Sequence, residues 1–249
     1  MASPRVLMPL PDRDFDTTES AVTWAALVGA GYQVDFATEN GMVAACDRFL
    51  IGKGWRYTFP ASEEAVTAYR RMEHDPRFQN PIPYQDVDVA AYVGVHFSGG
   101  HSPGMKQYLE SEVLHQQVPL FLAAGMTIGA VCHGVLVLAR AVDATTGRSV
   151  LEGREVTTLT KPIERMALGK TWYRVGRRYR TYRTYTEDEV RQAVGASGSV
   201  QRGESPGIPL AVVDGQFVTA RYPADVPTYA TTLIKHLGQQ SDSPTIHRA

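Results

Sequence analysis

Residues 130–134, with the sequence AVCHG, place a cysteine and a histidine between two apolar runs. Residues 127–131 predict a buried strand, and residues 135–139 predict an apolar helix. A sharp strand-to-helix turn points a thiol out of the sheet, where free N–H groups stabilise a thiolate and the oxyanion formed on a carbonyl. We therefore predict that Cys132 is a catalytic nucleophile and that His133 is its base or a backbone oxyanion donor. A buried structural cysteine beside an incidental histidine is the alternative.

A second motif, SGGH at residues 98–101, follows the predicted strand at 89–95. Glycines let a backbone approach a ligand closely, so Gly99 and Gly100 are candidates for an oxyanion or substrate site, with the Gly100 N–H as a donor. His101 would face the same site. The alternative is a simple turn, which explains both glycines equally well.

Glu19 lies just after the first predicted strand, in the motif FDTTE at residues 15–19. A carboxylate beside a nucleophilic cysteine can share a proton with it and act as a general acid or base. The alternative is a first-turn glutamate favoured by the helix dipole, with Thr17 or Thr18 as the helix cap. In an open α/β sheet, these motifs would meet at the carboxyl ends of the strands.

The order of predicted elements indicates an α/β protein with a mainly parallel sheet. Strands at 5–10 and 32–37 flank a helix that begins near residue 17, which is a βαβ unit. Residues 40–89 interrupt this order and are interpreted as an inserted cap. Residues 119–122 predict a further strand.

The C-terminal part predicts a hairpin and a final helix. Asp214-Gly215 separates two apolar runs, which is a strong hairpin signal. The last helix is expected at 228–237, followed by a polar tail at about 238–249. We interpret residues 1–249 as a single domain with the insertion and this tail.

Composition excludes several classes. The 249 residues carry a formal net charge of −1, which argues against nucleic-acid binding. The sequence has no signal-peptide pattern and no apolar run long enough to span a bilayer, so a cytoplasmic protein with reduced thiols is expected. Cys46 lacks the turn context of Cys132 and is interpreted as structural. His96 and His101 lack a matching ligand cluster, so no metal site is predicted and they are interpreted as structural or substrate-facing histidines.

Residues 170–185 are rich in tyrosine and arginine. Such a segment is typical of a subunit interface or an exposed surface, because both residue types are enriched in interfaces. The alternative is a wall of the substrate pocket that binds an anionic or aromatic group.

Four motifs together carry a family resemblance: FDTTE at 15–19, GGH at 99–101, AVCHG at 130–134, and VDGQFVTARYPAD at 213–225. In this order, over residues 4–237, the sequence resembles the ThiJ/PfpI family, the cysteine-containing branch of the class I glutamine amidotransferase-like superfamily. The insertion, with DPRFQNP at 75–81, is similar to that of the larger subgroup of heat-shock chaperone and glyoxalase III proteins.

The resemblance implies a flavodoxin-like three-layer sandwich with a nucleophile elbow, a homodimer, and cofactor-free chemistry on a small carbonyl compound. It implies conversion of methylglyoxal to lactate through a hemithioacetal on Cys132. Glu19 would be the acid/base and His133 a base or orienting partner. The acidic residue that orients His133 is not assigned, with Glu164 and Asp225 as candidates. Other readings are a hydrolase or hydratase on the same elbow, or a chaperone or oxidative-stress sensor that uses Cys132.

Overall fold

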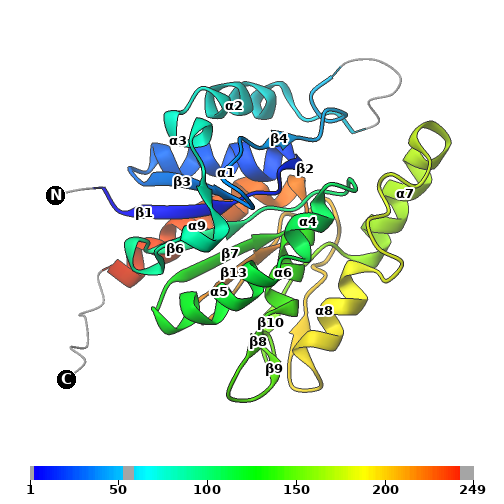
Figure 1. Ribbon diagram of the computed structural model, residues 1–249. Coiled ribbons are helices and arrows are strands. Elements are labelled where there is room, and N and C mark those ends of the chain that lie inside the picture. Colours follow the sequence, from blue (N-terminus) through cyan, green and yellow to red (C-terminus); the bar gives the residue numbers. More distant parts are fainter. Residues whose placement is uncertain (1–2, 53–58, 242–249) are drawn as a thin grey trace, which may run out of the picture.

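A seven-stranded sheet forms the centre of the protein (Figure 1), in the order β12-β13-β7-β6-β1-β3-β5. The computed structural model describes residues 3–52 and 59–241. All neighbouring strands are parallel except β12 and β13, which form an antiparallel hairpin. The strands are β1 (Arg5–Pro9), β3 (Gln33–Thr38), β5 (Ile82–Pro83), β6 (Gly94–Phe97), β7 (Thr127–Val131), β12 (Ala211–Asp214) and β13 (Phe217–Ala220).

The central strands are apolar runs because helices cover both faces of the sheet. Every residue of β6 and β7 is buried, as is typical of a parallel sheet. The five long strands β3, β1, β6, β7 and β13 have the spatial order 2-1-3-4-5 of a flavodoxin-like fold. The hairpin turn at Asp214-Gly215 is confirmed, with Gly215 in the left-handed region at φ 57°. The predicted fold class is therefore confirmed.

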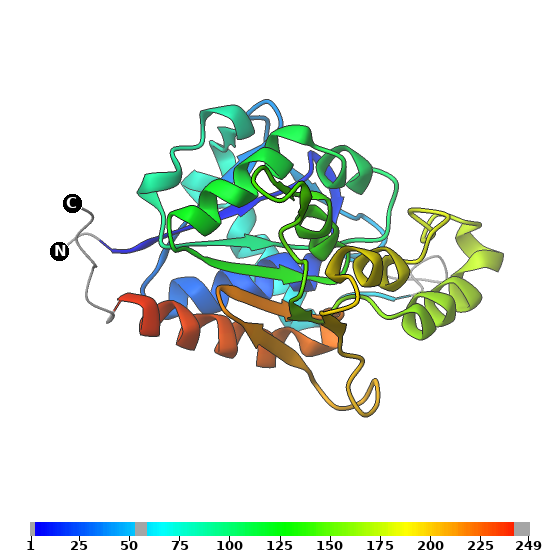
Figure 2. The same ribbon diagram turned by 90° about the horizontal axis from the view of Figure 1, so that it is seen from below.

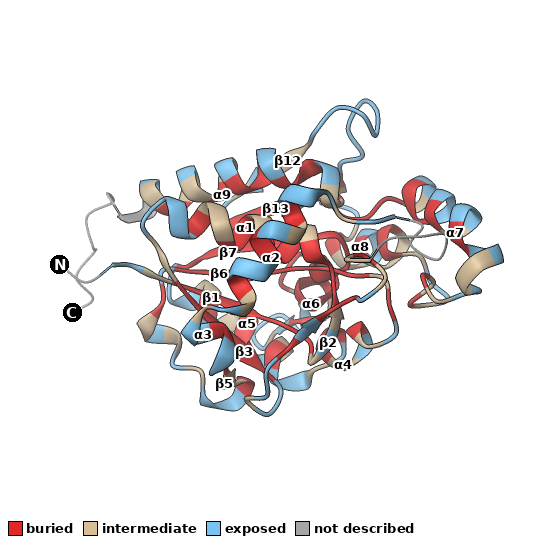
Figure 3. Ribbon diagram, turned by 90° about the horizontal axis from the view of Figure 1, so that it is seen from above, coloured by how far each residue is buried: buried red, intermediate tan, exposed pale blue. Residues whose placement is uncertain are grey.

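Helices α1 (Thr17–Gly29) and α9 (Val226–Ser241) pack side by side on one face of the sheet. The outer side of α9 is exposed (Figure 3), whereas in α1 only Val28 and Gly29 are exposed. The opposite face carries α4 (Met105–Leu109), α5 (Glu112–Ala123) and α6 (Val135–Arg140), as Figure 2 shows. The close contact between α9 and β7 requires glycine at position 129 in β7. A Cβ atom there would collide with the Tyr229 hydroxyl and lie 3.0 Å from Leu233, both in α9.

Two predicted elements differ from the structure. Residues 119–122 are not a strand, because they belong to α5, whose buried residues include Leu114, Val118 and Phe121 at helical spacing. Packing of this face decides the structure even though the helix contains Pro119. The last helix also continues past residue 237 to Ser241, so the predicted tail begins later; residues 242–249 lie outside the described residues.

The segment 40–89 packs on the edge of the main fold. Its helix α2 (Glu63–Glu73) lies against α1, and Phe78 of α3 (Pro76–Gln79) packs on Phe36 with ring centroids 5.0 Å apart. Residues 53–58 of this segment lie outside the described residues. The short strands elsewhere are β2 (Arg13–Phe15), β4 (Ala45–Cys46), β8 (Val142–Asp143), β9 (Arg148–Ser149), β10 (Glu155–Val156) and β11 (Ser199–Val200).

Helices α7 (Lys161–Val175) and α8 (Thr186–Val194) extend beyond the carboxyl ends of the parallel strands. In Figure 1 they lie on the right, whereas β1 begins and α9 ends at the opposite end of the sheet. This position places Ile163, Met166 and Ala167 of α7 around the same pocket as His101, which follows β6. Within the described part of the chain, no helix has both the length and the apolar character needed to cross a membrane.

Candidate active site

Cys132 occupies a strained turn between β7 and α6. Its φ of 58° lies in the left-handed region that few non-glycine residues adopt. The Thr158 hydroxyl donates a hydrogen bond of 2.9 Å to the Cys132 carbonyl. Gly134 completes the turn, because a Cβ there would collide with the carbonyl of Phe97 and lie 2.8 Å from that of Ser98. The elbow is thus held tightly against the end of β6.

Glu19 of α1 reaches the same place. Its Oε2 accepts a 2.8 Å hydrogen bond from the Gly99 N–H, and its Oε1 has no hydrogen-bond partner among the described residues. The carboxyl is fully buried. Burial, and secondarily the charge of Asp16, raise the pKa of Glu19 well above its usual value. The raised pKa favours the protonated carboxyl, which is the form that a general acid needs.

Gly99 brings the three groups together. A Cβ at this position would lie 2.7 Å from Glu19 Oε2, 2.8 Å from the Cys132 Cβ and 2.8 Å from the backbone nitrogen of His133. Only glycine leaves room for this packing. Of the two glycines, Gly99 donates its N–H to the acid rather than to a substrate, and Gly100 follows in an extended backbone at φ 159°.

Asp16 is a site residue that the sequence analysis did not single out. It is the N-cap of α1, where its Oδ1 accepts from the N–H groups of Thr18 at 2.8 Å and Glu19 at 3.0 Å. The cap expected at Thr17 or Thr18 is therefore wrong by one or two positions. The preference of helix N-caps for aspartate is the sequence signal that could have identified Asp16. Burial, reinforced by the charge of Asp47, raises the Asp16 pKa to about 6.

His133 lies beside the thiol, with its Nδ1 3.6 Å from the Cys132 Sγ. Burial lowers the pKa of His133 well below its usual value, and the neighbouring His101 and Arg140 act in the same direction. The imidazole is neutral at pH 7 and can accept a proton. Burial, followed by the charges of Glu19 and Asp16, raises the pKa of the Cys132 thiol well above its usual value. The resting pair is therefore a neutral thiol and a neutral imidazole.

His101 packs edge-on against His133, with ring centroids 4.9 Å apart. One ligand atom each from His101, Cys132 and His133 lie within 4.8 Å of one another, so these residues could supply three ligands to a zinc ion. His96, considered with His101 from the sequence, is not part of this group. Its ring lies 2.7 Å from the Tyr229 hydroxyl and 3.1 Å from the Glu19 carbonyl.

The two acidic candidates for orienting His133 are engaged with arginines. Glu164 binds Arg180 at 2.5 Å and accepts from the Thr186 N–H at 3.1 Å. Asp225 binds Arg221 at 2.8 Å. The side chain that packs on the His133 ring is instead His101.

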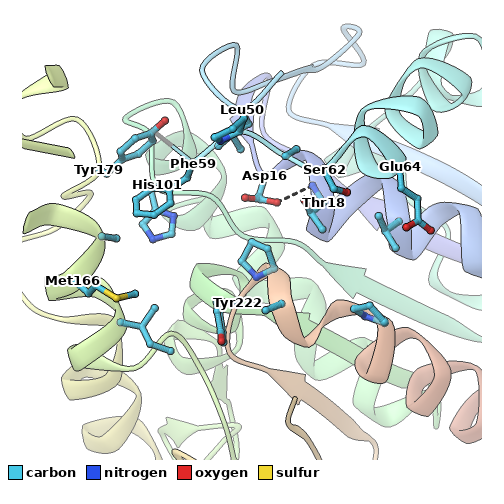
Figure 4. A pocket seen from close by; sticks show the side chains of 18 residues that line it. Asp16, Thr18, Leu50, Phe59, Ser62, Glu64, His101, Met166, Tyr179 and Tyr222 are labelled. Carbon is cyan, nitrogen blue, oxygen red and sulfur yellow. Dashed lines mark hydrogen bonds between the residues drawn. The ribbon is translucent and has the colours of Figure 1, made fainter. Parts of the chain in front are cut away.

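A pocket of about 660 Å³ opens next to these residues (Figure 4). Asp16 and His101 line it, together with Tyr179 and with residues of α7. Cys132 is fully buried and is not among the lining residues. The pocket therefore meets the reactive centre at Asp16 and His101. Its described lining consists of Asp16, Thr18, Val22, Leu50, Phe59, Pro60, Ala61, Ser62, Glu64, His101, Ile163, Met166, Ala167, Tyr179, Tyr222, Pro223, Ala224 and Pro227.

The tyrosine- and arginine-rich segment 170–185 has two parts. Trp172 and Tyr173 on α7 are exposed, at 63% and 60%. Tyr179 is buried and packs edge-on against His101, with centroids 5.9 Å apart, and the Thr181 hydroxyl donates to the His101 carbonyl at 2.7 Å. The second part therefore supports the Gly-Gly-His loop from outside.

Cys46, interpreted as structural, is buried and unpaired. Its backbone N–H donates to the Tyr69 hydroxyl at 3.4 Å. Burial raises the pKa of its thiol to about 11. Cys46 lies in the short strand β4 and not on a strand-to-helix turn such as the one that holds Cys132.

The sheet order and the buried cysteine on the strand-to-helix turn define a flavodoxin-like α/β protein with a cysteine at the nucleophile-elbow position. A family profile described as "ThiJ/PfpI family-like" matches residues 10–193, and the chain belongs to this family. It is 24% identical over 212 residues to the glutathione-independent glyoxalase HSP31 of Saccharomyces cerevisiae, covering 83% of this chain and 82% of that protein.

Other relatives are more distant or match in part. An uncharacterised protein of Schizosaccharomyces pombe is 26% identical over 145 residues, and the match spans 55% of this chain and only 54% of that protein. The crystal structure of a glyoxalase III from Candida albicans is similar in fold, with a TM-score of 0.71 and 19% identity, over 94% of this chain and 97% of that one.

Proposed function

We propose that this protein is a cofactor-independent cysteine enzyme that converts an α-oxoaldehyde to a 2-hydroxy acid, as a glyoxalase III does. The observation that carries the proposal is the placement of the Glu19 carboxyl and Cys132 around Gly99. The carboxyl accepts the Gly99 N–H, and a side chain at position 99 would meet both Glu19 and Cys132. Similarity to HSP31, which is named as a glyoxalase, supports the same chemistry.

The first step is addition of the Cys132 thiol to the aldehyde. The sulfur forms a bond to the aldehyde carbon, and the thiol proton passes to His133, whose neutral ring lies 3.6 Å away. His133 then passes this proton to the former carbonyl oxygen, which becomes the hydroxyl of a hemithioacetal. The Gly100 and His133 N–H groups are the proposed donors to the developing oxyanion.

The second step moves a proton between the two former carbonyl carbons. Glu19, as a carboxylate after giving a proton to the ketone oxygen, removes the hydrogen from the carbon that bears sulfur. Glu19 returns this proton to the neighbouring carbon, and the hydroxyl on the sulfur-bearing carbon gives its proton to the Glu19 carboxylate. This leaves a 2-hydroxy thioester and restores the Glu19 carboxyl. Water then hydrolyses the thioester, which releases the 2-hydroxy acid and restores the thiol. The sum is one oxoaldehyde and one water converted to one hydroxy acid, with no external oxidant or reductant.

The test is incubation of the purified protein with methylglyoxal in the absence of glutathione, with lactate measured as the product. We expect lactate from the wild type and none above background from Cys132→Ser. Absence of lactate, and of the corresponding acid from any other α-oxoaldehyde, would refute the proposal. A hydrolase or hydratase would instead turn over amides or isonitriles in the same assay format. A sensor would show Cys132 oxidation without turnover.

A further inference from the structure

We propose that the natural substrate is an uncharged carbonyl compound with a bulky apolar group, such as an aryl or branched alkyl group, held in the pocket between α7 and the start of α1. The inference rests on the proposed function for the reacting end of the molecule. It goes beyond that function in assigning the remainder of the substrate.

The first argument is size. The pocket holds about 660 Å³, which is in the range that encloses ligands much larger than a triose. Methylglyoxal has three carbons and two oxygens and would fill only about a quarter of this volume, at about 30 Å³ per heavy atom. The remaining space would contain water against apolar walls, which is unfavourable.

The second argument is the chemistry of the walls. The described lining is mostly aliphatic, aromatic or proline, including Leu50, Ile163 and Met166. Removing an apolar group from water into such surroundings is favourable in proportion to the buried area. The walls therefore select for an apolar substituent.

The third argument is charge. The pocket contains two acidic side chains, Asp16 and Glu64, and the residues described as lining it include no lysine or arginine. The arginines nearest in sequence to Tyr179 are paired elsewhere, Arg178 with Asp14 at 3.0 Å and Arg180 with Glu164 at 2.5 Å. A substrate carboxylate or phosphate would meet negative charge in the described walls rather than a cation.

The fourth argument is the burial of the thiol. Cys132 is fully buried, whereas His101 both lines the pocket and packs on His133 at 4.9 Å. Figure 4 shows Asp16 and His101 on the pocket wall, with Leu50 and Tyr179 nearby. Because the thiol is enclosed, we expect only a small group to reach the sulfur from the side of Asp16 and His101. An aldehyde at the end of a bulky molecule meets this requirement, with the bulk left in the pocket.

The test compares kcat/KM for methylglyoxal, phenylglyoxal and 4-carboxyphenylglyoxal. We expect phenylglyoxal to exceed methylglyoxal by about tenfold or more, mainly through KM, because its ring is buried on binding. The carboxylated analogue places a negative charge on a ring of the same size. We expect its kcat/KM to fall about tenfold or more below that of phenylglyoxal.

Variants that fill the pocket test the location. Ala167→Leu on α7 and Ala61→Leu on the facing loop each add volume to a different wall. In both, we expect the phenylglyoxal-to-methylglyoxal ratio of kcat/KM to fall about fivefold or more. The matched control is Trp172→Ala, on the same helix as Ala167 but 63% exposed and outside the lining. It should leave the ratio within about twofold, and melting temperatures confirm that each variant is folded.

A binding measurement separates this inference from the proposed function. Ligand-observed NMR with acetophenone, which has the aryl group but no aldehyde, should show binding that Ala167→Leu weakens, and benzoate should not bind. If no oxoaldehyde is turned over but acetophenone binds in this way, the proposed function fails and the pocket assignment stands. If methylglyoxal is turned over at least as well as phenylglyoxal and acetophenone does not bind, the pocket assignment is wrong. If nothing binds and nothing is turned over, both are wrong.

Discussion

The Glu19 carboxyl accepts the Gly99 N–H at 2.8 Å, although 80 positions separate the two residues in the chain. This hydrogen bond joins the start of α1 to the loop after β6. The Asp16 N–H, which donates to the Gly99 carbonyl at 2.8 Å, forms a second link between the same two segments. The candidate acid is therefore fixed in direction, and the Cβ of Cys132 lies close to the same glycine. Fixed groups of this kind reduce the reorganisation needed in a transition state.

Replacement of Cys132 by serine should reduce turnover by about a thousandfold or more, because the hydroxyl is a much weaker nucleophile than the thiol. Serine is only slightly smaller than cysteine and can occupy the same turn, so the melting temperature should change by only a few degrees. The matched control is Cys46→Ala, which removes the other thiol and should keep activity within about threefold. Substantial turnover by the serine variant would disprove the nucleophile assignment.

Replacement of Glu19 by glutamine should lower kcat by about 10²- to 10⁴-fold. The amide oxygen can still accept the Gly99 N–H, but the side chain can no longer transfer a proton. Glu63→Gln makes the same substitution in the first turn of α2, at an exposed position, and should be neutral. Steady-state kinetics on the best substrate decide the question. Equal activity of the two variants would remove Glu19 from the mechanism.

Asp16 predicts a specific dependence of stability on pH. Burial raises its pKa to about 6 in the folded protein from 3.8, so the folded state binds this proton more tightly than the unfolded state. Its stabilising contribution is therefore fully present below about pH 4 and is lost as the pH rises through about 6. The loss is on the order of 2–3 kcal/mol.

Asp16→Asn keeps a side-chain oxygen for the α1 N-cap and removes the titration. The free energy of unfolding of the variant minus that of the wild type should therefore increase between pH 4 and pH 7, by on the order of 2 kcal/mol. Urea unfolding at several pH values measures this difference. A difference that does not change with pH would show that Asp16 keeps an ordinary pKa.

Gly99→Ala should impair both stability and activity. The added Cβ would lie 2.7 Å from Glu19 Oε2 and 2.8 Å from the Cys132 Cβ, so either the acid or the elbow must move. Overpacking of this kind costs about 1–3 kcal/mol, and displacement of the acid should lower kcat about a hundredfold. Gly29→Ala is the control, because a Cβ there meets no atom within 4 Å. If both variants behave like the wild type, the close packing at Gly99 is unimportant.

Local sequence patterns predicted the elements that carry the chemistry. The apolar run that ends at Cys132 and the run after it specify a strand and a helix. The short turn between them restricts the direction in which the Cys132 side chain can point. The contacts that require glycine at 99 and 134 involve Glu19, the elbow and the end of β6, so they follow from the folded structure rather than from the local pattern. Local patterns failed at residues 119–122, because a four-residue apolar run is compatible with either a strand or a helix.

The tertiary structure alone decided which side chains meet at the site. His101 packs between His133 and Tyr179, three residues from separate segments, and no periodicity in the sequence reports such contacts. The role of Asp16 emerges because α1 is docked against the Gly-Gly-His loop. The apolar pocket exists because α7 is placed opposite α1. The sequence by itself therefore determined the strand-to-helix elbow and the cysteine that it carries, through local backbone preferences. Long-range packing decided what surrounds that atom, since burial and pKa depend on the residues that folding brings into contact.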